Sequence, residues 1–233
     1  MKLSIVIPCF NEAKNIPLIL EKFENIIKRN DIEVLFVNNG SLDNSKKVLN
    51  ELLPNYPFAK IVEVKENQGY GFGIISGLNE AQGEFIGYTH ADLQTDPGDV
   101  IRALDIIEAQ NNSEMIYVKG LRRGRPILDN FFTYGMSLFE TIYLGTKLWD
   151  INAQPNIFHR TFFAKLKKTC PKDFSLDLYF LYVAKKRGFN LVRFNVIFPK
   201  RIHGESSWNT GISSRWNFIK RTYKYSIKLK KEL

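Results

Sequence analysis

The sequence predicts an α/β fold in which a mostly parallel central sheet is flanked by helices and followed by a basic helical C-terminal part. Apolar runs with the length and composition of buried strands occur at 3–8, 33–38, 60–64, 84–89, 115–119 and 190–198. The first five runs are separated by helical patterns, at about 14–29, 42–53, 70–82 and 97–110. Strands that alternate with helices of this length form parallel sheets, in which ligands bind beyond the carboxyl ends of the strands.

The composition fits one large domain, or one domain with an appendage. The chain has 233 residues, of which 44% are hydrophobic, so it can bury a sizeable core. Its two cysteines, Cys9 and Cys170, are too few for a disulfide framework, which fits a reducing compartment. The first apolar run is too short for a signal peptide and is interrupted by Pro8, so it is interpreted as the first strand.

Charge is distributed unevenly along the chain. Residues 1–118 contain 10 Lys and Arg against 17 Asp and Glu, a net charge of −7. Residues 119–233 contain 23 against 7, a net charge of +16. A basic half of this kind suits nucleic acid, anionic lipid or a phosphorylated substrate. Because no nucleic-acid-binding motif accompanies it, we expect a phosphate- and membrane-facing surface and no nucleic-acid partner.

The most informative segment follows the fourth apolar run. Asp92 and Gln94 are two residues apart beyond a predicted strand end, so their oxygens can face one hard cation such as Mg²⁺ or Mn²⁺. His90 precedes them and is a third candidate ligand. Asp96 is the expected N-cap of the next helix, with Pro97 at its first position. The alternative is an ordinary strand-to-helix turn.

Polar residues and glycines also follow the first three runs. The candidate ligand-binding residues are Pro8, Asn11 and Glu12 after the first run, Asn38 and Asn39 after the second, and Gly69 and Gly71 after the third. The asparagines either hydrogen-bond a nucleotide base or only shape their turns. The glycines lack the Gly-x-Gly-x-x-Gly spacing of a dinucleotide-binding loop, which argues against a nicotinamide or flavin cofactor.

The basic half contains candidates for binding phosphate and acceptor. They are Arg122, Arg123 and Arg125 after the fifth run, Asn152 and Gln154, Asp177 near a helix start, and Arg201 and Ser206 after the last run. Guanidinium groups pair well with phosphate oxygens. The alternative for the arginines is that they belong to a solvated basic loop without a ligand. The alternative for Asp177 is that it only stabilises the start of its helix through the helix dipole.

In chain order, these segments resemble family 2 glycosyltransferases of the GT-A fold, especially the polyprenyl-phosphate sugar transferases such as dolichol-phosphate mannose synthase. The usual Asp-Ala-Asp-Leu-Gln turn is matched by Asp92 and Gln94, whereas His90 replaces the first Asp. Asn38 and Asn39 stand where the family usually has at least one Asp. Gln154-Pro155 replaces the usual Gly-Phe, so the sugar preference is expected to differ from mannose.

The resemblance implies an inverting transferase that uses a nucleotide-diphosphate sugar and Mg²⁺ or Mn²⁺. The implied acceptor is a polyprenyl phosphate or a lipid-linked or cell-surface glycan. A phosphate acceptor needs no general base, whereas a sugar hydroxyl would need one, and Asp177 is the candidate. The implied catalytic residues are Asp92, Asp177 and Arg201; the implied nucleotide-sugar contacts are Pro8, Asn11, Glu12, Asn38, Asn39, Gly69, Gly71, Ala91 and Asp92. The two rival functions are a sugar-nucleotide transferase or hydrolase, and a non-catalytic nucleotide- or carbohydrate-binding protein.

We therefore expect a donor-binding half at 1–119, an acceptor-binding half of the same domain at 120–210, and a basic amphipathic helix at 211–233. The tail has Trp216, Ile219, Tyr223 and Ile227 at helical spacing among lysines, which suits an anionic membrane surface or a core-packed helix. An aromatic segment at 131–149 contains Glu140 and Lys147, so it is expected to be a core or interfacial helix instead of a membrane span. The expected location is cytoplasmic, peripheral at the cytoplasmic face of the membrane, with the oligomeric state left open.

Overall fold

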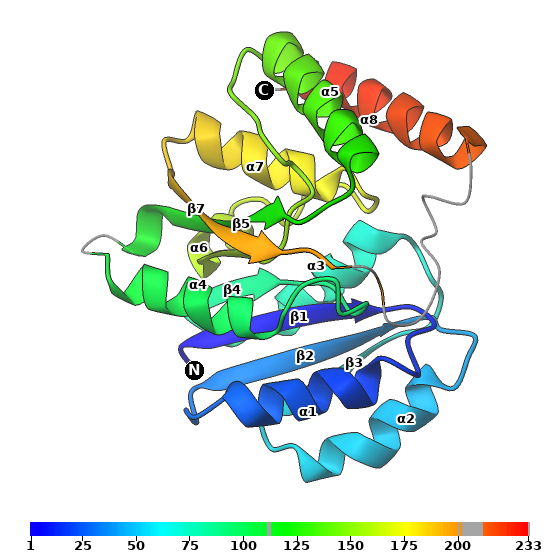
Figure 1. The fold of residues 1–233 in the computed structure, drawn as a ribbon. Helices are drawn as coiled ribbons and strands as arrows, with labels where there is room; N and C mark the ends of the chain where they lie inside the picture. Colours follow the sequence, from blue (N-terminus) through cyan, green and yellow to red (C-terminus); the bar gives the residue numbers. More distant parts are fainter. Residues whose placement is uncertain (111–112, 200, 202–211, 233) are drawn as a thin grey trace.

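A seven-stranded sheet forms the centre of the protein (Figure 1). The computed structural model describes residues 1–110, 113–199, 201 and 212–232. The strand order is β3-β2-β1-β4-β6-β5-β7, and among these strands β6 alone runs antiparallel to its neighbours. The prediction of a mostly parallel sheet is therefore confirmed. The strands are β1 (Leu3–Cys9), β2 (Ile32–Asn39), β3 (Ala59–Val64), β4 (Phe85–Tyr88), β5 (Ile116–Arg123), β6 (Asn156–His159) and β7 (Asn190–Ile197).

Helices cover both faces of the sheet. One apolar core lies between the sheet and α1, α2 and α4, and the other lies between the sheet and α3, α6 and α7. Helices α5 and α8 lie side by side on the second core, far from α1 and α2 (Figure 1). The helices are α1 (Ile16–Ile26), α2 (Ser45–Leu52), α3 (Tyr70–Glu80), α4 (Gly98–Glu108), α5 (Ile127–Leu144), α6 (Arg160–Ala164), α7 (Leu176–Lys186) and α8 (Ile212–Glu232).

Strand β6 was not predicted, and it lies inside the expected acceptor-binding half. Its two neighbouring strands each place a glycine against it. A Cβ on Gly120 would lie 2.0 Å from the carbonyl oxygen of Gln154, and one on Gly87 would lie 2.2 Å from that of Asn156. Any larger residue at these two positions would push the strand away, so the glycines permit the antiparallel pairing.

The aromatic helix begins and ends earlier than predicted. It spans Ile127–Leu144 instead of 131–149. Pro126 precedes its first residue, and Gly145 ends it in the left-handed conformation with φ of 62°. The other helix starts are close to the predicted ones. Helix α4 begins at Gly98 with Pro97 as its N-cap, one residue later than predicted, and Asp96 Oδ1 accepts a 2.9 Å hydrogen bond from the Gly98 N–H.

No helix within the described ranges is both long enough and apolar enough to cross a bilayer. This agrees with the prediction for the aromatic segment.

Candidate active site

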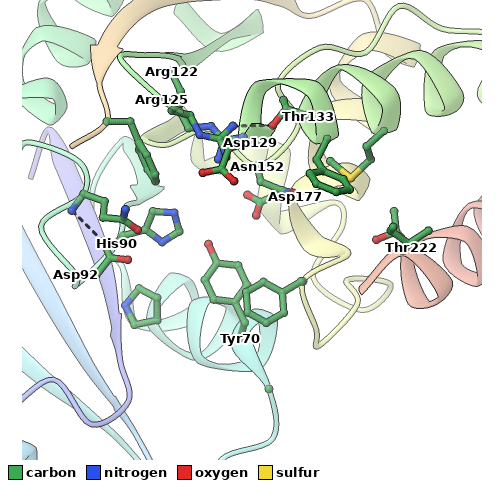
Figure 2. A pocket seen from close by; sticks show the side chains of 18 of the residues that line it. Tyr70, His90, Asp92, Arg122, Arg125, Asp129, Thr133, Asn152, Asp177 and Thr222 are labelled. Carbon is green, nitrogen blue, oxygen red and sulfur yellow. Dashed lines mark hydrogen bonds between the residues drawn. The ribbon is translucent and has the colours of Figure 1, made fainter. Parts of the chain in front are cut away.

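A cleft of about 1840 Å³ opens at the carboxyl ends of β1, β4 and β5 and continues between α5 and α8. This is the edge of the sheet at which the sequence motifs were expected to meet. Figure 2 shows that side chains from well-separated segments point into the same space, including Tyr70, His90, Asp92, Arg122 and Asp177.

Asp92 and Gln94 converge on one cationic group. Asp92 Oδ2 lies 2.8 Å from Arg201 Nη2, and Gln94 Oε1 accepts a 3.0 Å hydrogen bond from Arg201 Nε. The other Asp92 oxygen accepts a bond from the Gln94 backbone N–H at 3.0 Å, which fixes the carboxylate in the turn. Two oxygens from residues 92 and 94 therefore already share one positive charge, and both are of the type that binds a hard divalent cation.

His90 and Glu12 border the same end of the cleft, and burial lowers the pKa of His90. Its ring is thus favoured in the neutral form, which has a lone pair available for a cation. Burial raises the pKa of Glu12 to about 7, and the nearby Asp92 carboxylate contributes to this rise. Within the described residues no group of three or more His, Cys, Asp and Glu side chains is arranged to hold a metal alone, so oxygens of a bound substrate would have to complete the coordination.

Two of the three predicted arginines line the cleft. Arg122 is held by Asp150, whose Oδ1 accepts from its Nε at 2.8 Å and whose Oδ2 accepts from its backbone N–H at 2.8 Å. Arg125 Nη1 donates to Thr133 Oγ1 at 2.6 Å. Arg123 instead points along the sheet and donates to Asn195 Oδ1 at 2.9 Å, outside the cleft lining.

Phe198, which was not predicted as a site residue, lies at the arginine-rich end of the cleft. Its ring lies beside both cleft arginines, with the guanidinium carbons of Arg122 and Arg125 at 5.3 and 5.6 Å from the ring centre. A cation–π contact of this kind orients a guanidinium without using its hydrogen-bond donors.

Asp177 lies at the base of the cleft and is 2% exposed. Its Oδ1 accepts hydrogen bonds from Tyr88 OH at 2.8 Å and from Gln154 Nε2 at 3.0 Å. Burial raises the pKa of Asp177, although the charge of Lys119 and the Tyr88 hydrogen bond oppose the rise. The carboxyl group is therefore held in a fixed orientation, as a general base requires.

Lys119 lies beneath this carboxyl group and is fully buried. Its Nζ donates to the Ala153 carbonyl and to Asn156 Oδ1, both at 2.7 Å. Burial lowers the pKa of Lys119 to about 7. The Asn156 amide connects this lysine to Gln154, because its Nδ2 donates to Gln154 Oε1. The lysine was not predicted, since in the sequence it is a single charge at the end of the apolar run 115–119.

The remaining predicted residues separate into two groups. Those that line the cleft are Pro8, Asn11, Glu12, Asn39, Gly69, Ala91, Gln94, Asn152 and Arg201. Asn38, Gly71 and Gln154 lie behind the lining: Asn38 Oδ1 accepts from the Ser41 N–H, and Gln154 supports Asp177. A Cβ on Gly71 would lie 2.6 Å from the Pro171 carbonyl oxygen, so this glycine admits a neighbouring loop. Ser206 lies outside the described residues.

The far end of the cleft is apolar. Its lining there comes from two helices and is mostly apolar: Phe131, Phe132, Met136 and Phe139 of α5 and Ile219, Tyr223 and Ile227 of α8, together with Glu140, Lys220, Thr222 and Lys224. Buried Glu140 of α5 joins the helices, because Ser226 Oγ of α8 lies 2.7 Å from both of its carboxyl oxygens. The cleft thus changes from a polar end rich in arginine to an apolar groove.

The Glu140 contact predicts a pH effect on stability. Burial raises the pKa of Glu140 from 4.5 to about 7, so ionisation opposes folding and the free energy of unfolding falls as pH rises between these values. We expect Glu140→Gln to raise the free energy of unfolding by about 1–3 kcal/mol at pH 8 and to leave it unchanged near pH 4. Urea denaturation at both pH values measures this. An equal effect at both values would show that the charge is not the cause.

The chain is similar to known sugar transferases over its first two thirds. The model of glycosyl transferase family 2 matches residues 4–165, which is more than half of the chain. An undecaprenyl-phosphate 4-deoxy-4-formamido-L-arabinose transferase of Yersinia enterocolitica is 34% identical over 111 residues, covering 46% of this chain and 34% of that protein. A prophage bactoprenol glucosyl transferase homologue of Escherichia coli is 34% identical over 122 residues, covering 51% and 39%. The matches thus span well under half of the length of these curated relatives.

Solved structures share the fold at low sequence identity. A mannosyltransferase of Pyrobaculum calidifontis in complex with GDP-mannose and Mn²⁺ superimposes with a TM-score of 0.71 at 16% identity, covering 97% of this chain and 64% of that one. Glucosyl-3-phosphoglycerate synthase of Mycobacterium tuberculosis, in complex with Mn²⁺, UDP and glucosyl-3-phosphoglycerate, has a TM-score of 0.68 at 16% identity, covering 92% and 76%. The GT-A architecture expected from the sequence is therefore confirmed.

Proposed function

This chain belongs to glycosyltransferase family 2, and we propose that it transfers a sugar from a nucleotide-diphosphate donor to a polyprenyl phosphate with inversion at the anomeric carbon. The two curated relatives described above, by their names, act on undecaprenyl phosphate or bactoprenol. Neither fixes the sugar or the nucleotide base for this chain.

The observation that carries this proposal is the change of character along the single cleft. Its polar end has arginines at positions 122, 125 and 201 and suits a diphosphate, whereas its other end is a groove of aromatic and aliphatic side chains between α5 and α8. An acceptor that joins a phosphate to a long apolar chain matches both parts. A glycan acceptor would leave the groove without a role, so the lipid phosphate is the better match.

The donor side fits a divalent cation. Asp92 and Gln94 would hold it with an oxygen each, His90 would be a further ligand, and Arg201 would exchange Asp92 for the donor diphosphate. When bound, Mg²⁺ or Mn²⁺ would offset the charge that develops on the leaving diphosphate.

The arginines of the cleft supply the rest of the electrostatic stabilisation. An acceptor phosphate oxygen attacks the anomeric carbon from the face opposite the diphosphate; the new carbon–oxygen bond forms as the bond to the diphosphate breaks, and its electron pair leaves with the diphosphate. Arg122 and Arg125 stabilise the phosphate groups of donor and acceptor. The attacking oxygen is already anionic, so no side chain has to remove a proton.

The test is a transfer assay with the full chain. UDP-, GDP- and dTDP-sugars are supplied with Mn²⁺ to undecaprenyl phosphate in detergent, and the lipid product is detected by mass spectrometry. A glycosylated lipid phosphate from one donor supports the proposal. Donor binding with release of nucleotide but no lipid product would favour a hydrolase, and metal-independent binding without turnover would favour a binding protein.

The variant Asp177→Asn distinguishes the two acceptor classes. We expect transfer to a lipid phosphate to fall by less than about tenfold, because that oxygen needs no base, whereas transfer to a sugar hydroxyl would fall by about 10²–10⁴-fold. The measurement is the initial rate with each acceptor. A loss of lipid transfer as large as that predicted for a hydroxyl acceptor would contradict the lipid-phosphate mechanism, provided that circular dichroism shows the variant folded.

We also place the chain at a membrane surface, where such an acceptor resides. The net charge of +16 over residues 119–233 supports this placement. Both cysteines are free, which supports the cytoplasmic face.

A further inference from the structure

Helix α5 buries two polar side chains and exposes a row of apolar ones. Ser137 and Glu140 are both fully buried and hydrogen-bonded, to Asp150 and to Ser226. The opposite side, here called the outer face of α5, is exposed. It consists of Ile127, Phe131, Tyr134, Leu138, Phe139 and Ile142. A helix on the surface of a soluble domain normally has the reverse arrangement.

The outer face is continuous and strongly exposed. The steps from Ile127 to Ile142 through positions 131, 134 and 138 are three or four residues, which places these side chains on one side of the helix. Ile127 is 87% exposed, Phe131 71% and Ile142 73%. A contiguous exposed apolar surface of this kind marks a site that binds another protein or a membrane.

The charges of the neighbouring helix α8 indicate which of these partners covers the outer face of α5. The described side chains of α8 include exposed lysines at 220, 224, 228 and 231, spaced by three or four residues, and residues 219–231 contain no Asp or Glu. Lys230 Nζ lies 4.6 Å from the centre of the Tyr143 ring, so the cationic helix borders the aromatic one. Apolar side chains flanked by lysines suit a bilayer with anionic headgroups, to which lysines near the surface are attracted.

A second copy of the chain suits this surface less well. A two-fold contact through the outer face of α5 would bring the same patch of both copies together. The lysines of α8 would then border the lysines of the partner, and no Asp or Glu among residues 219–231 would compensate them. An anionic bilayer has the complementary charge.

We propose that the outer face of α5 inserts into the interface of an anionic bilayer, with the lysines of α8 lying along the headgroups. Phe131 and Phe139 belong both to this face and to the apolar end of the cleft. The groove therefore opens at the inserted surface, and an acceptor with a lipid chain could enter it directly from the bilayer. This last consequence rests on the proposed function; the docking itself does not.

Vesicle flotation with the full chain tests the docking, without donor or acceptor present. Vesicles of phosphatidylcholine with 30% phosphatidylglycerol are compared with pure phosphatidylcholine. We expect binding to the anionic vesicles that weakens as salt rises, and much weaker binding to the neutral ones. No binding of the parent chain to anionic vesicles would overturn the proposal.

Variants on exposed positions outside the cleft lining locate the surface. We expect the double variant Ile127→Ser with Ile142→Ser to reduce the vesicle partition coefficient about tenfold or more, and Lys228→Glu with Lys231→Glu to remove the preference for anionic lipid. Leu42→Ser is the matched control, because Leu42 is 88% exposed on the loop before α2, and it should bind as the parent does. Unchanged binding of the isoleucine double variant would overturn the assignment to α5.

Two further measurements separate the competing explanations. Analytical ultracentrifugation tests whether a second copy covers the outer face of α5. Self-association of the parent chain that is absent in the isoleucine double variant, together with no vesicle binding by the parent, would show that the partner is a second copy. The proposal would then fail. Sugar transfer to a short-chain polyprenyl phosphate in solution reports on the proposed function alone. Transfer without vesicle binding overturns only the docking, and vesicle binding without transfer overturns only the proposed function.

Discussion

Replacing Asp92 by Ala is expected to abolish the effect of Mn²⁺ on donor binding and to slow sugar transfer by about 10²–10³-fold. Asp92 Oδ2 is one of two oxygens that already converge on the Arg201 guanidinium, and its Oδ1 is fixed by the Gln94 N–H. Without this carboxylate, the proposed cation site keeps only the Gln94 oxygen and His90. Calorimetric titration with UDP-, GDP- and dTDP-sugars, with and without Mn²⁺, measures the binding.

Asp96→Ala is the matched control for this experiment. Asp96 is a carboxylate of the same turn, but it accepts a hydrogen bond from the first N–H of α4 and does not line the cleft. The substitution Asp96→Ala should lower the free energy of unfolding by about 1 kcal/mol and leave donor binding unchanged. Metal-dependent donor binding that persists in Asp92→Ala would show that the cation, if one is used, is held elsewhere.

Replacing Asp150 by Asn is expected to lower the free energy of unfolding at pH 7 by about 3–5 kcal/mol. The Arg122 side chain is 8% exposed and that of Asp150 is 4% exposed, so the variant leaves a guanidinium buried without its counter-charge. Asn tolerates the left-handed backbone of this position, where φ is 42°, so the substitution isolates the charge. Urea denaturation followed by circular dichroism measures the change.

The pH dependence gives a second test of this ion pair. Burial alone would raise the pKa of Asp150, but Arg122 outweighs it and lowers the pKa below its ordinary value of 3.8. The stabilisation is therefore complete above the pKa of the unfolded chain and is lost as pH falls through the lower pKa of the folded one. The difference between the parent and Asp150→Asn should shrink under acid conditions.

Asp31→Asn is the control, because Asp31 also pairs with an arginine but at the surface. The side chains of Asp31 and Arg29 are 36% and 38% exposed, so solvent screens the pair and its loss should cost less than about 1 kcal/mol. Equal effects of the two substitutions would show that burial does not strengthen the Arg122–Asp150 pair.

Much of the proposed donor side was predictable from the sequence because its residues directly follow strands. Asn11, Asn39, Asp92 and Gln94 come within a few residues of a strand end, and parallel strands bring such ends to one edge of the sheet. Arg122 and Arg125 were predictable for the same reason, because they lie at or just beyond the end of β5. Prediction was less accurate for Gln154, which lies in the loop before β6 and bonds Asp177. It was also less accurate for Arg123, because one residue of strand alternation separates it from Arg122.

The acceptor side depended on contacts between distant segments. Lys119, Asn156 and Asp177 come from β5, β6 and α7, and their grouping follows from the antiparallel insertion of β6 between β4 and β5. No local pattern signals this insertion, since β6 has only four residues and its pairing depends on glycines of the two neighbouring strands.

The sequence by itself determined the alternation of strands and helices, the family, and the positions at which polar residues leave the strands. These properties depend on local periodicity and turn chemistry, which each segment carries without its neighbours. Only the tertiary structure decided which side of α5 faces outward. That helix is apolar around most of its circumference, so its orientation was set by where Ser137 and Glu140 found buried hydrogen-bond partners, and this left its aromatic side exposed beside the lysines of α8.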